Sequence, residues 1–274
     1  MTTQWRGLLQ NLGLWTGSFA QFSPDGTLLQ ETPSQLSLTL SENQQRVDLC
    51  LKRFPNHQPA SVINLQFSYP GPGRQVPFLE QGAFSQGTLQ YSKVSRFGAE
   101  LSMIWGDRRL RLVPQYATGS QLTHLTLICE TRADCPPSPP LTLEKLLGHW
   151  QGEAHTSYAD GRNPDRYATD LQVIQRGDQV QQRMQFADYK METTGQIHPC
   201  AIEFTSGPQP LRLLMLPGGG SSLGPLEIQS GVPFFLEAGW WIEPGLRQRL
   251  IRRYSDRGEW ESLTLVIERQ ISPR

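Results

Sequence analysis

The chain has 274 residues and carries 25 basic and 25 acidic side chains, so its formal net charge is zero. That length supports one large domain or two of ordinary size. A neutral chain lacks the excess of basic residues that an electrostatic nucleic-acid binder needs, so we expect no nucleic acid as partner. No apolar run approaches the roughly 18 residues that a membrane-spanning helix requires, so we expect no membrane span.

The amino terminus and the cysteines bear on location. Residues 1–15 lack the apolar core and small-residue cleavage site of a secretory signal. The chain has four cysteines, far fewer than a small disulfide-stapled secreted domain, and none are in CxxC spacing. We therefore expect a cytoplasmic protein with free thiols, in which Cys50 and Cys129 are small buried apolar residues.

The first predicted element is a short helix over Gln4–Asn11, followed by the motif LGLWTG at residues 12–17. A second short helix is predicted over Thr142–Leu147, with Thr142 as its cap, and LGHWQG follows at 147–152. Both motifs have the pattern G-x-W-x-G at an offset of 135 positions. Later segments also match in order: FGAEL with FFLEA, RLRLVPQY with RQRLIRRY, and HLTLICE with SLTLVIE, at offsets of 137 to 138. These ordered matches indicate a tandem duplication.

The segment ADCPPSPP at 133–140 lies between the two copies. Its prolines favour a stiff extended connector, because proline cannot donate a sheet hydrogen bond. We therefore expect an N-terminal domain at 1–132, a proline-rich linker at 133–140 and a C-terminal domain at 141–274.

Within each copy the hydrophobic pattern has mostly a period of two and is interrupted by Gly, Pro and Asp clusters. This pattern is typical of short antiparallel strands, and no alternation of strands with helices is present. The chain is therefore predicted to be all-β, as a barrel or a sandwich. The G-x-W-x-G motif favours the barrel, with Trp15 and Trp150 each plugging one end.

The same features carry a family resemblance. The segments NLGLWTGSF, EQGAFSQG, FGAEL, GDRRLRLV and LLGHWQGEA are similar to a cyanobacterial family of two-domain calycin (lipocalin-like) proteins of unknown function. That family resembles, more distantly, the S/T-type phycobiliprotein lyases, which hold a linear tetrapyrrole. The resemblance implies two tandem lipocalin-like barrels, each preceded by a short helix, and by analogy a bilin or other tetrapyrrole as ligand.

Two arginine pairs recur in both copies at alternate positions of a predicted strand, and therefore on one face of it: Arg109 with Arg111, and Arg247 with Arg249. They could face solvent while leucines fill the barrel. Alternatively they could face inward, where a guanidinium needs a carboxylate, an aromatic ring or an anionic ligand. Glu100 and Glu237 are candidate partners. Arg132 and Arg269 are rival candidates for stacking on the motif tryptophans.

Aromatic residues are concentrated in the second copy. In Trp240-Trp241 one ring must face inward and the other outward, because neighbouring side chains of a strand alternate. Core filling, ligand contact and docking against another surface are all open roles. The candidate ligand-binding residues are Arg247, Arg249, Glu237, Trp240, Trp241, Tyr254, Arg109, Arg111, Glu100 and Tyr116.

The five histidines form no metal motif, and no nucleophile motif or phosphate loop occurs. His198 near Cys200 is a weak candidate for a base or a haem ligand. We predict no catalytic residues and no metal.

The leading hypothesis is binding or carriage of a small, partly apolar, pigment-like ligand without catalysis. The alternatives are a chromophore lyase with a phycobiliprotein subunit as partner, and an interaction module with filled barrels.

Overall fold

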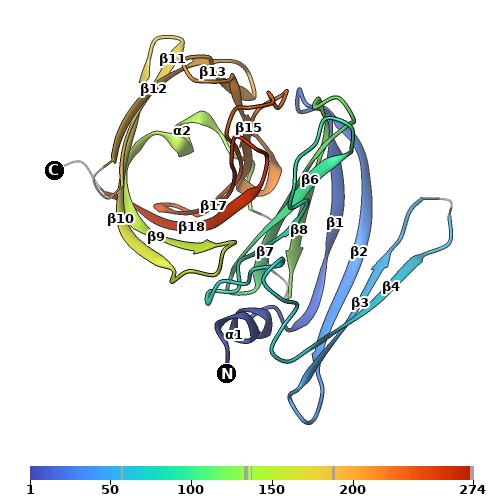
Figure 1. Ribbon diagram of the computed structural model, residues 1–274. Coiled ribbons are helices and arrows are strands. Elements are labelled where there is room, and N and C mark those ends of the chain that lie inside the picture. Colours follow the sequence, from blue (N-terminus) through green and yellow to red (C-terminus); the bar gives the residue numbers. More distant parts are fainter. Residues whose placement is uncertain (57, 133–134, 137, 187–188, 272–274) are drawn as a thin grey trace.

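The computed structural model describes residues 1–271 except 57, 133–134, 137 and 187–188. The fold is all-β with two tandem barrel-type sheets, each preceded by a short helix, as predicted (Figure 1). The N-terminal half contains α1 (Thr3–Leu9), β1 (Gly13–Phe22), β2 (Leu28–Leu40), β3 (Arg46–Arg53), β4 (Ser61–Ser68), β5 (Phe84–Gly87), β6 (Phe97–Trp105), β7 (Arg108–Tyr116) and β8 (Leu122–Thr131). The C-terminal half contains α2 (Leu143–Leu146), β9 (Gly148–Tyr158), β10 (Asp165–Arg176), β11 (Gln179–Phe186), β12 (Tyr189–Ile197), β13 (Ala201–Phe204), β14 (Leu211–Met215), the 3₁₀ turn η1 (Pro217–Gly219), β15 (Gly220–Gly224), β16 (Phe234–Glu243), β17 (Leu246–Tyr254) and β18 (Trp260–Ile271).

The two sheets differ in closure. Strands β9 to β18 form a closed antiparallel barrel, whereas the N-terminal strands form a curled sheet in the order β4-β3-β2-β1-β8-β7-β6-β5. The predicted pair of barrels is thus one closed barrel and one half-barrel, with β4 and β5 as the edges of the described N-terminal sheet. The hairpin β13–β14 bridges β12 to β15 in the closed barrel.

The G-x-W-x-G motif starts the first strand of each sheet. Gly13 and Gly148 have φ of 121° and 116°, which L side chains rarely adopt. Gly17 lies so close to β8 that a Cβ would overlap the carbonyl oxygen of Cys129, and Gly152 is in the same relation to Ile267 on β18. The glycines are therefore required by the backbone turn and by close strand contact.

The halves pack through one face of each sheet. We call the face that carries Trp15 or Trp150 the inner face, and the opposite one the outer face. The outer face of β6 packs on β16 and β17, and that of β7 on β15 and β16. The contact is apolar; its core includes Leu101, Met103, Leu110, Leu112, Leu236, Trp240, Leu250 and Leu265.

This interface is reciprocal. The Tyr116 hydroxyl donates to the carbonyl of Pro225 (2.7 Å), and the Tyr254 hydroxyl donates to the carbonyl of Thr88 (2.9 Å). Tyr254 matches Tyr116 and Pro225 matches Thr88 in the repeat, so each half gives the other the same contact. The halves are therefore joined as the subunits of a two-fold symmetric dimer are.

Part of the expected linker at 133–140 lies outside the described residues, namely residues 133, 134 and 137. The domain boundaries therefore stay a prediction.

Thr142 is the N-cap residue of α2, as expected, but its side chain makes no capping hydrogen bond. No helix in the described residues is long and apolar enough to cross a membrane.

Candidate functional site

A buried ion cluster lies on the inner face of the C-terminal barrel. Arg247 and Arg249 on β17 both bind the carboxylate of Glu268 on β18, with Nε–Oε2 at 2.6 Å for Arg247 and Nη2–Oε1 at 2.8 Å for Arg249. Nη1 of Arg249 also reaches Oε2 of Glu237 on β16, at 3.5 Å. We call these four residues the C-terminal cluster. Each is less than 9% exposed.

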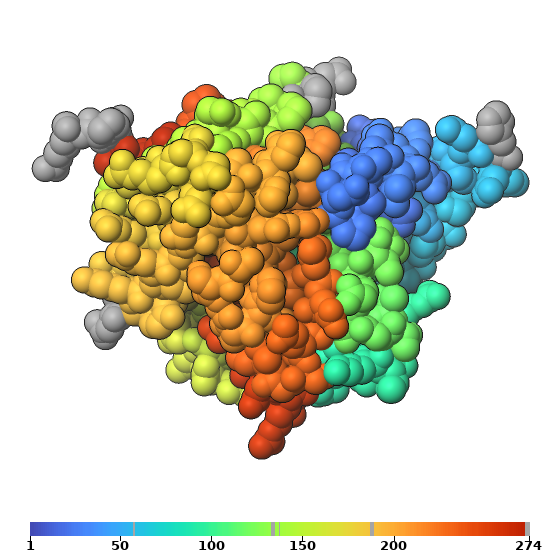
Figure 2. Space-filling model, turned by 90° about the horizontal axis from the view of Figure 1, so that it is seen from above, coloured from blue at the N-terminus to red at the C-terminus, as the bar shows by residue number. Residues whose placement is uncertain are grey.

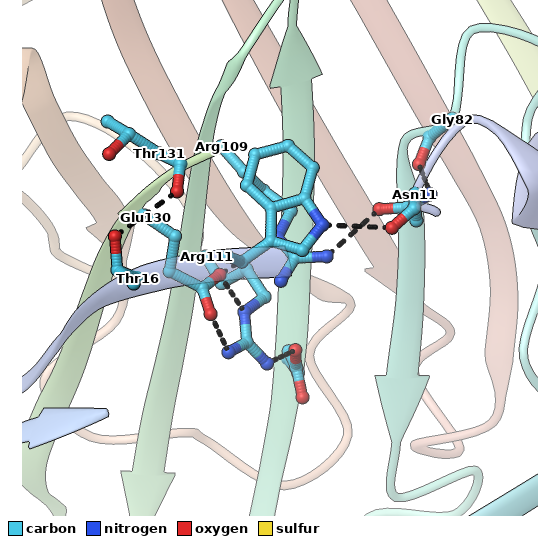
Figure 3. Close-up of polar contacts among 9 residues, drawn as sticks. Asn11, Thr16, Gly82, Arg109, Arg111, Glu130 and Thr131 are labelled. Carbon is cyan, nitrogen blue, oxygen red and sulfur yellow. Dashed lines mark hydrogen bonds and ion pairs between the residues drawn. The ribbon is translucent and has the colours of Figure 1, made fainter. Parts of the chain in front are cut away.

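The N-terminal sheet contains the same arrangement, the N-terminal cluster, shown in Figure 3. Nε of Arg109 lies 2.8 Å from Oε2 of Glu130, and Nη2 of Arg111 lies 2.9 Å from Oε1 of the same carboxylate. Nη1 of Arg111 lies 2.9 Å from Oε1 of Glu100. The duplication has therefore preserved two arginines and two glutamates in equivalent positions.

The arginines thus face inward, which is one of the two orientations that the sequence left open. The solvent-facing alternative is wrong, and so is its expectation that leucines fill the barrel. Leu110 and Leu250 lie on the outer face, at 1% and 0% exposure, in the contact between the halves. Both faces of β7 and β17 are buried, one against the ion cluster and one against the other half.

The clusters hold their central carboxylates ionised. Burial alone would raise the pKa of Glu268, but the charges and hydrogen bonds of Arg247 and Arg249 outweigh it and lower that pKa to about 2. The pKa of Glu130 is lowered for the same reason by Arg111 and Arg109. Burial raises the pKa of Glu237, and Arg249 opposes this only partly. Glu237 is therefore the carboxylate of the C-terminal cluster that protonates most readily.

Each cluster rests on its motif tryptophan. Cζ of Arg109 lies 4.3 Å from the ring centroid of Trp15, and Cζ of Arg247 lies 4.2 Å from that of Trp150. Both indoles are fully buried and donate to a carbonyl four residues earlier. Their equivalent placement is compatible with the predicted role as plugs.

Of the rival arginines, only one stacks on a motif tryptophan. Cζ of Arg132 lies 4.6 Å from the ring of Trp15, so Trp15 has two guanidinium neighbours. Arg269 is exposed. The residue that matches Arg132 in the repeat is Gln270, whose side chain donates to the carbonyl of Leu147.

A cavity of about 430 Å³ adjoins the C-terminal cluster. Its polar wall includes Arg247, Arg249 and Glu237. The apolar part of the wall includes Leu146, Leu171, Met184, Phe204, Leu213 and Trp241. This combination of an apolar enclosure with a few convergent polar groups is typical of small-molecule sites.

Two predicted ligand-binding residues lie elsewhere. Tyr116 and Tyr254 belong to the apolar contact between the halves, so their proposed role in ligand contact is corrected. Trp240 belongs to the same apolar contact and also lines the cavity. Trp240 and Trp241 point to opposite faces, as adjacent strand residues must, and Trp241 packs with the inner core. The aromatic content of β16 and β17 could not show which face of the sheet would meet the other half.

Protein side chains fill the part of the N-terminal inner face that surrounds the N-terminal cluster, whereas Ile63 and Leu65 of β4 on the same face are exposed. Trp5 and Leu8 of α1 and Phe78 pack with Trp15 and Leu36 in one apolar cluster. Arg109, Arg111 and Glu100 are thus part of a packed core, and the candidate site lies in the C-terminal half.

The central glutamates were absent from the predicted site. Glu130 and Glu268 end the matched segments HLTLICE and SLTLVIE, so their recurrence was visible in the sequence. The sequence does not contain the strand pairing, which places Arg109 opposite Glu130 and Arg247 opposite Glu268.

The other reactive groups form no comparable site. His198 faces Glu203, with Nε2–Oε2 at 3.5 Å, and the thiol of Cys200 donates to the carbonyl of Asp25. All four cysteines are free. Among the described residues, which exclude His57, no group of three or more His, Cys, Asp or Glu side chains could hold a metal ion.

The fold and the duplicated clusters define a tandem all-β protein made of two barrel-type domains. Residues 1–135 match the N-terminal model of the DUF3598 family, a domain of unknown function, and residues 137–271 match a model described as the C-terminal domain of biogenesis factor required for ATP synthase 1. A crystal structure of a DUF3598 protein of unknown function from Nostoc punctiforme is 41% identical, with a TM-score of 0.90 over 99% of this chain and 100% of that chain. The chain belongs to the DUF3598 family.

Two further structural matches are much weaker. The S-type phycobiliprotein lyase CpeS from Guillardia theta is 13% identical, with a TM-score of 0.40 over 48% of this chain and 91% of that chain. Transferrin binding protein B from Haemophilus parasuis is 8% identical, with a TM-score of 0.28 over 89% of this chain and 53% of that chain. No curated protein matches the chain.

Proposed function

We propose that the C-terminal barrel binds a small, partly apolar molecule in the cavity beside the C-terminal cluster, without catalysing a reaction on it. The observation that carries this proposal is the enclosure of about 430 Å³ in which two buried guanidinium groups share a wall with apolar side chains. That volume is within the usual range for ligand sites, roughly 300–1,000 Å³.

The cavity residues have separable roles. Leu171, Leu213 and Trp241 provide an apolar surface that would take up the body of the ligand. Arg249 is held by two carboxylates, Glu268 and Glu237, and so contributes a fixed polar wall. A ligand that buries its apolar part here must also satisfy the polar groups that its entry removes from water.

The identity of the ligand rests on the resemblance noted in the sequence. A linear tetrapyrrole is the first probe to use, and a phycobiliprotein subunit remains the partner if the bound pigment is handed on in a lyase-like role. The four free thiols favour a reducing compartment such as the cytoplasm.

The test is binding to purified protein of two probes, the tetrapyrrole biliverdin and the neutral dye Nile red, followed by absorption and fluorescence. Met184→Trp would fill the cavity, because Met184 lines it. We expect this variant to bind at least tenfold more weakly. Ile174→Trp is the matched control, because Ile174 lies on the neighbouring strand β10, is 38% exposed and does not line the cavity. Unchanged binding by Met184→Trp would place the probes outside the cavity and contradict the proposal.

A second candidate function, docking on another protein, is favoured by the edge strand β4. It carries exposed apolar side chains, Val62, Ile63 and Leu65, at 52%, 40% and 49% exposure. The hairpin β3–β4 extends away from the rest of the molecule, and its cyan residues form one margin of Figure 2. Exposed apolar edges of this kind are available for strand addition. The description of the model that matches the C-terminal half, a biogenesis factor required for ATP synthase 1, is compatible with such a role.

This candidate is tested by co-sedimentation with purified ATP synthase. We expect Ile63→Lys with Leu65→Lys to abolish association, because two charges would replace the apolar edge. Val94→Lys in the same half is the control, since Val94 is 85% exposed and belongs to the connection between β5 and β6. Failure of the unmodified protein to associate would remove this candidate.

A further inference from the structure

The two ion clusters differ in one neighbour. In the N-terminal cluster, Nη1 of Arg109 donates to the side-chain oxygen of Asn11 at 3.3 Å (Figure 3). The amide nitrogen of Asn11 donates to the carbonyls of Gly7 and Gly82, at 3.1 and 2.9 Å. These two bonds fix the amide so that its oxygen is aimed at Arg109.

Leu146 takes this position in the C-terminal half. Asn11 stands four residues before Trp15 and its carbonyl accepts from that indole; Leu146 stands four residues before Trp150 and does the same, at 3.1 Å. The side chain of Leu146 has no atom that accepts a hydrogen bond. The two copies therefore share the backbone contact, and the N-terminal copy alone has the side-chain acceptor.

The guanidinium of Arg247 has fewer hydrogen-bond partners than that of Arg109. Within the described residues its guanidinium makes one hydrogen bond, from Nε to Glu268, while the Trp150 ring covers one of its faces. Its buried Nη2 has no partner. Arg109 also has an unpartnered Nη2, but its Nη1 is bound by Asn11. The two guanidinium groups therefore differ at Nη1, for which the described residues supply an acceptor in the N-terminal half and none in the C-terminal half. A guanidinium N–H without an acceptor is unfavourable, so Nη1 of Arg247 is available to an acceptor from a ligand.

Arg247 lies in the wall of the cavity that would hold the ligand. Arg247 and Leu146 both line the cavity of about 430 Å³, whose other walls are largely apolar. Arg247 shares its carboxylate partner, Glu268, with Arg249, as Arg109 shares Glu130 with Arg111. An acceptor with its own negative charge fits this position better than a neutral one.

We propose that the ligand of the C-terminal barrel is an organic acid with an apolar body, and that its carboxylate accepts a hydrogen bond from Nη1 of Arg247, in the place that the Asn11 side chain has in the N-terminal half. This inference rests on the proposed ligand-binding function and adds the chemical class of the ligand.

The test compares decanoic acid with 1-decanol, which have the same chain length but differ in the charged group, by titration calorimetry. The unmodified protein is expected to bind the acid at least tenfold more tightly. Leu146→Asn supplies the internal acceptor and is expected to reduce acid binding at least tenfold more than it reduces decanol binding. Leu143→Asn is the matched control on α2, because Leu143 does not line the cavity.

Other outcomes separate the two proposals. Equal affinities of the unmodified protein for acid and alcohol overturn the inference while leaving the binding function in place, and this comparison needs no variant that might fold poorly. Unreduced acid binding by a folded Leu146→Asn protein also overturns the inference. Arg247→Met, as a second variant, is expected to abolish the preference for the acid, so that the acid and decanol bind with similar affinities. Failure of both compounds and of Nile red to bind contradicts the proposed function itself.

Discussion

The two halves begin with the same motif and contain the same ion cluster, yet only the second closes into a barrel. In the C-terminal half 22 residues, 198–219, separate β12 from β15 and form the hairpin β13–β14 that completes the ring. In the N-terminal half only 15 residues, 69–83, separate β4 from β5, and Phe78 of this segment packs with α1 on the inner face. The longer segment between β12 and β15 therefore closes the C-terminal sheet. The G-x-W-x-G motif and the ion cluster occur in both the closed barrel and the half-barrel.

The motif and the ion cluster have different surroundings in the two halves. In the N-terminal half, Asn11 and the apolar residues of α1 complete the surroundings of Arg109. In the C-terminal half, Leu146 and the cavity leave Arg247 incomplete. Under the proposed function, the presence or absence of one acceptor separates a cluster with a structural role from one that binds a ligand.

Removal of the central carboxylates, Glu130 and Glu268, is expected to have the largest effect on stability in both halves. Glu130→Gln and Glu268→Gln would each leave two buried guanidinium groups without their common partner, and we expect a loss of about 3–5 kcal/mol in the free energy of unfolding for each. Denaturant titration measures the loss, with the exposed Glu261→Gln as a control near zero. A loss below 1 kcal/mol in one half would mean that its cluster does not hold the fold.

Acidification should remove part of the same stabilisation. The folded-state pKa of Glu268 is lowered to about 2 from an ordinary 4.5. A carboxyl with a depressed pKa stabilises the folded state above its unfolded pKa, and this contribution is lost as the pH falls from about 4.5 to about 2. We expect the loss to be on the order of 3 kcal/mol. Melting temperatures of the unmodified protein and Glu268→Gln should therefore converge in this window, and parallel curves would contradict the assignment.

The close strand contact at the motif predicts a smaller loss in each half. Gly17→Ala and Gly152→Ala would place a methyl group against a backbone carbonyl of the neighbouring strand, which cannot move without opening the sheet. We expect each to cost about 2–3 kcal/mol in unfolding free energy. Gly207→Ala is a suitable control, since a Cβ there makes only ordinary contacts. Tolerance of alanine at Gly152 alone would show that the closed barrel is more adaptable than the half-barrel.

The reciprocal tyrosines probe the contact between the halves. Tyr116→Phe and Tyr254→Phe each remove one hydrogen bond to a carbonyl of the other half, with an expected loss of about 1 kcal/mol for Tyr116→Phe. Tyr254→Phe should cost more, because the Tyr254 hydroxyl also accepts from Nε of Arg252. Thermal unfolding of the two single variants and the double variant measures this. A larger effect of Tyr116→Phe would contradict the asymmetry.

These comparisons also show what the sequence could predict. Gly13, Trp15, Gly17 and their matches predicted the duplication and the strand class, because backbone constraints recur wherever the fold does. The strand period of two placed Arg247 and Arg249 on one face but could not say which, since Leu250 on the opposite face is equally buried. Ion pairing with Glu268, the interface role of Tyr254 and the closing hairpin all depend on contacts between distant segments, which a local pattern does not contain.

Arg252 offers the smallest expected effect and a contrast to the clusters. It is fully buried, yet its partners are the hydroxyls of Tyr254 and Ser85 and the ring of Trp260, and no carboxylate pairs with it among the described residues. The matching position in the N-terminal half is Pro114, which carries no charge. Burial of an uncompensated guanidinium is costly, so Arg252→Met should leave the free energy of unfolding within about 1 kcal/mol of the unmodified protein, or raise it.

Chemical denaturation at neutral pH measures this effect, with the exposed Arg253→Met as the control on the same strand. A loss above 2 kcal/mol would show that the hydroxyl and indole contacts stabilise a buried guanidinium as well as the carboxylates of the clusters do. In that case, the absence of an acceptor beside Nη1 of Arg247 would no longer indicate a missing ligand, because Glu268 and the Trp150 ring would be sufficient partners for that guanidinium. The result for Arg252 thus bears directly on the difference between the two halves.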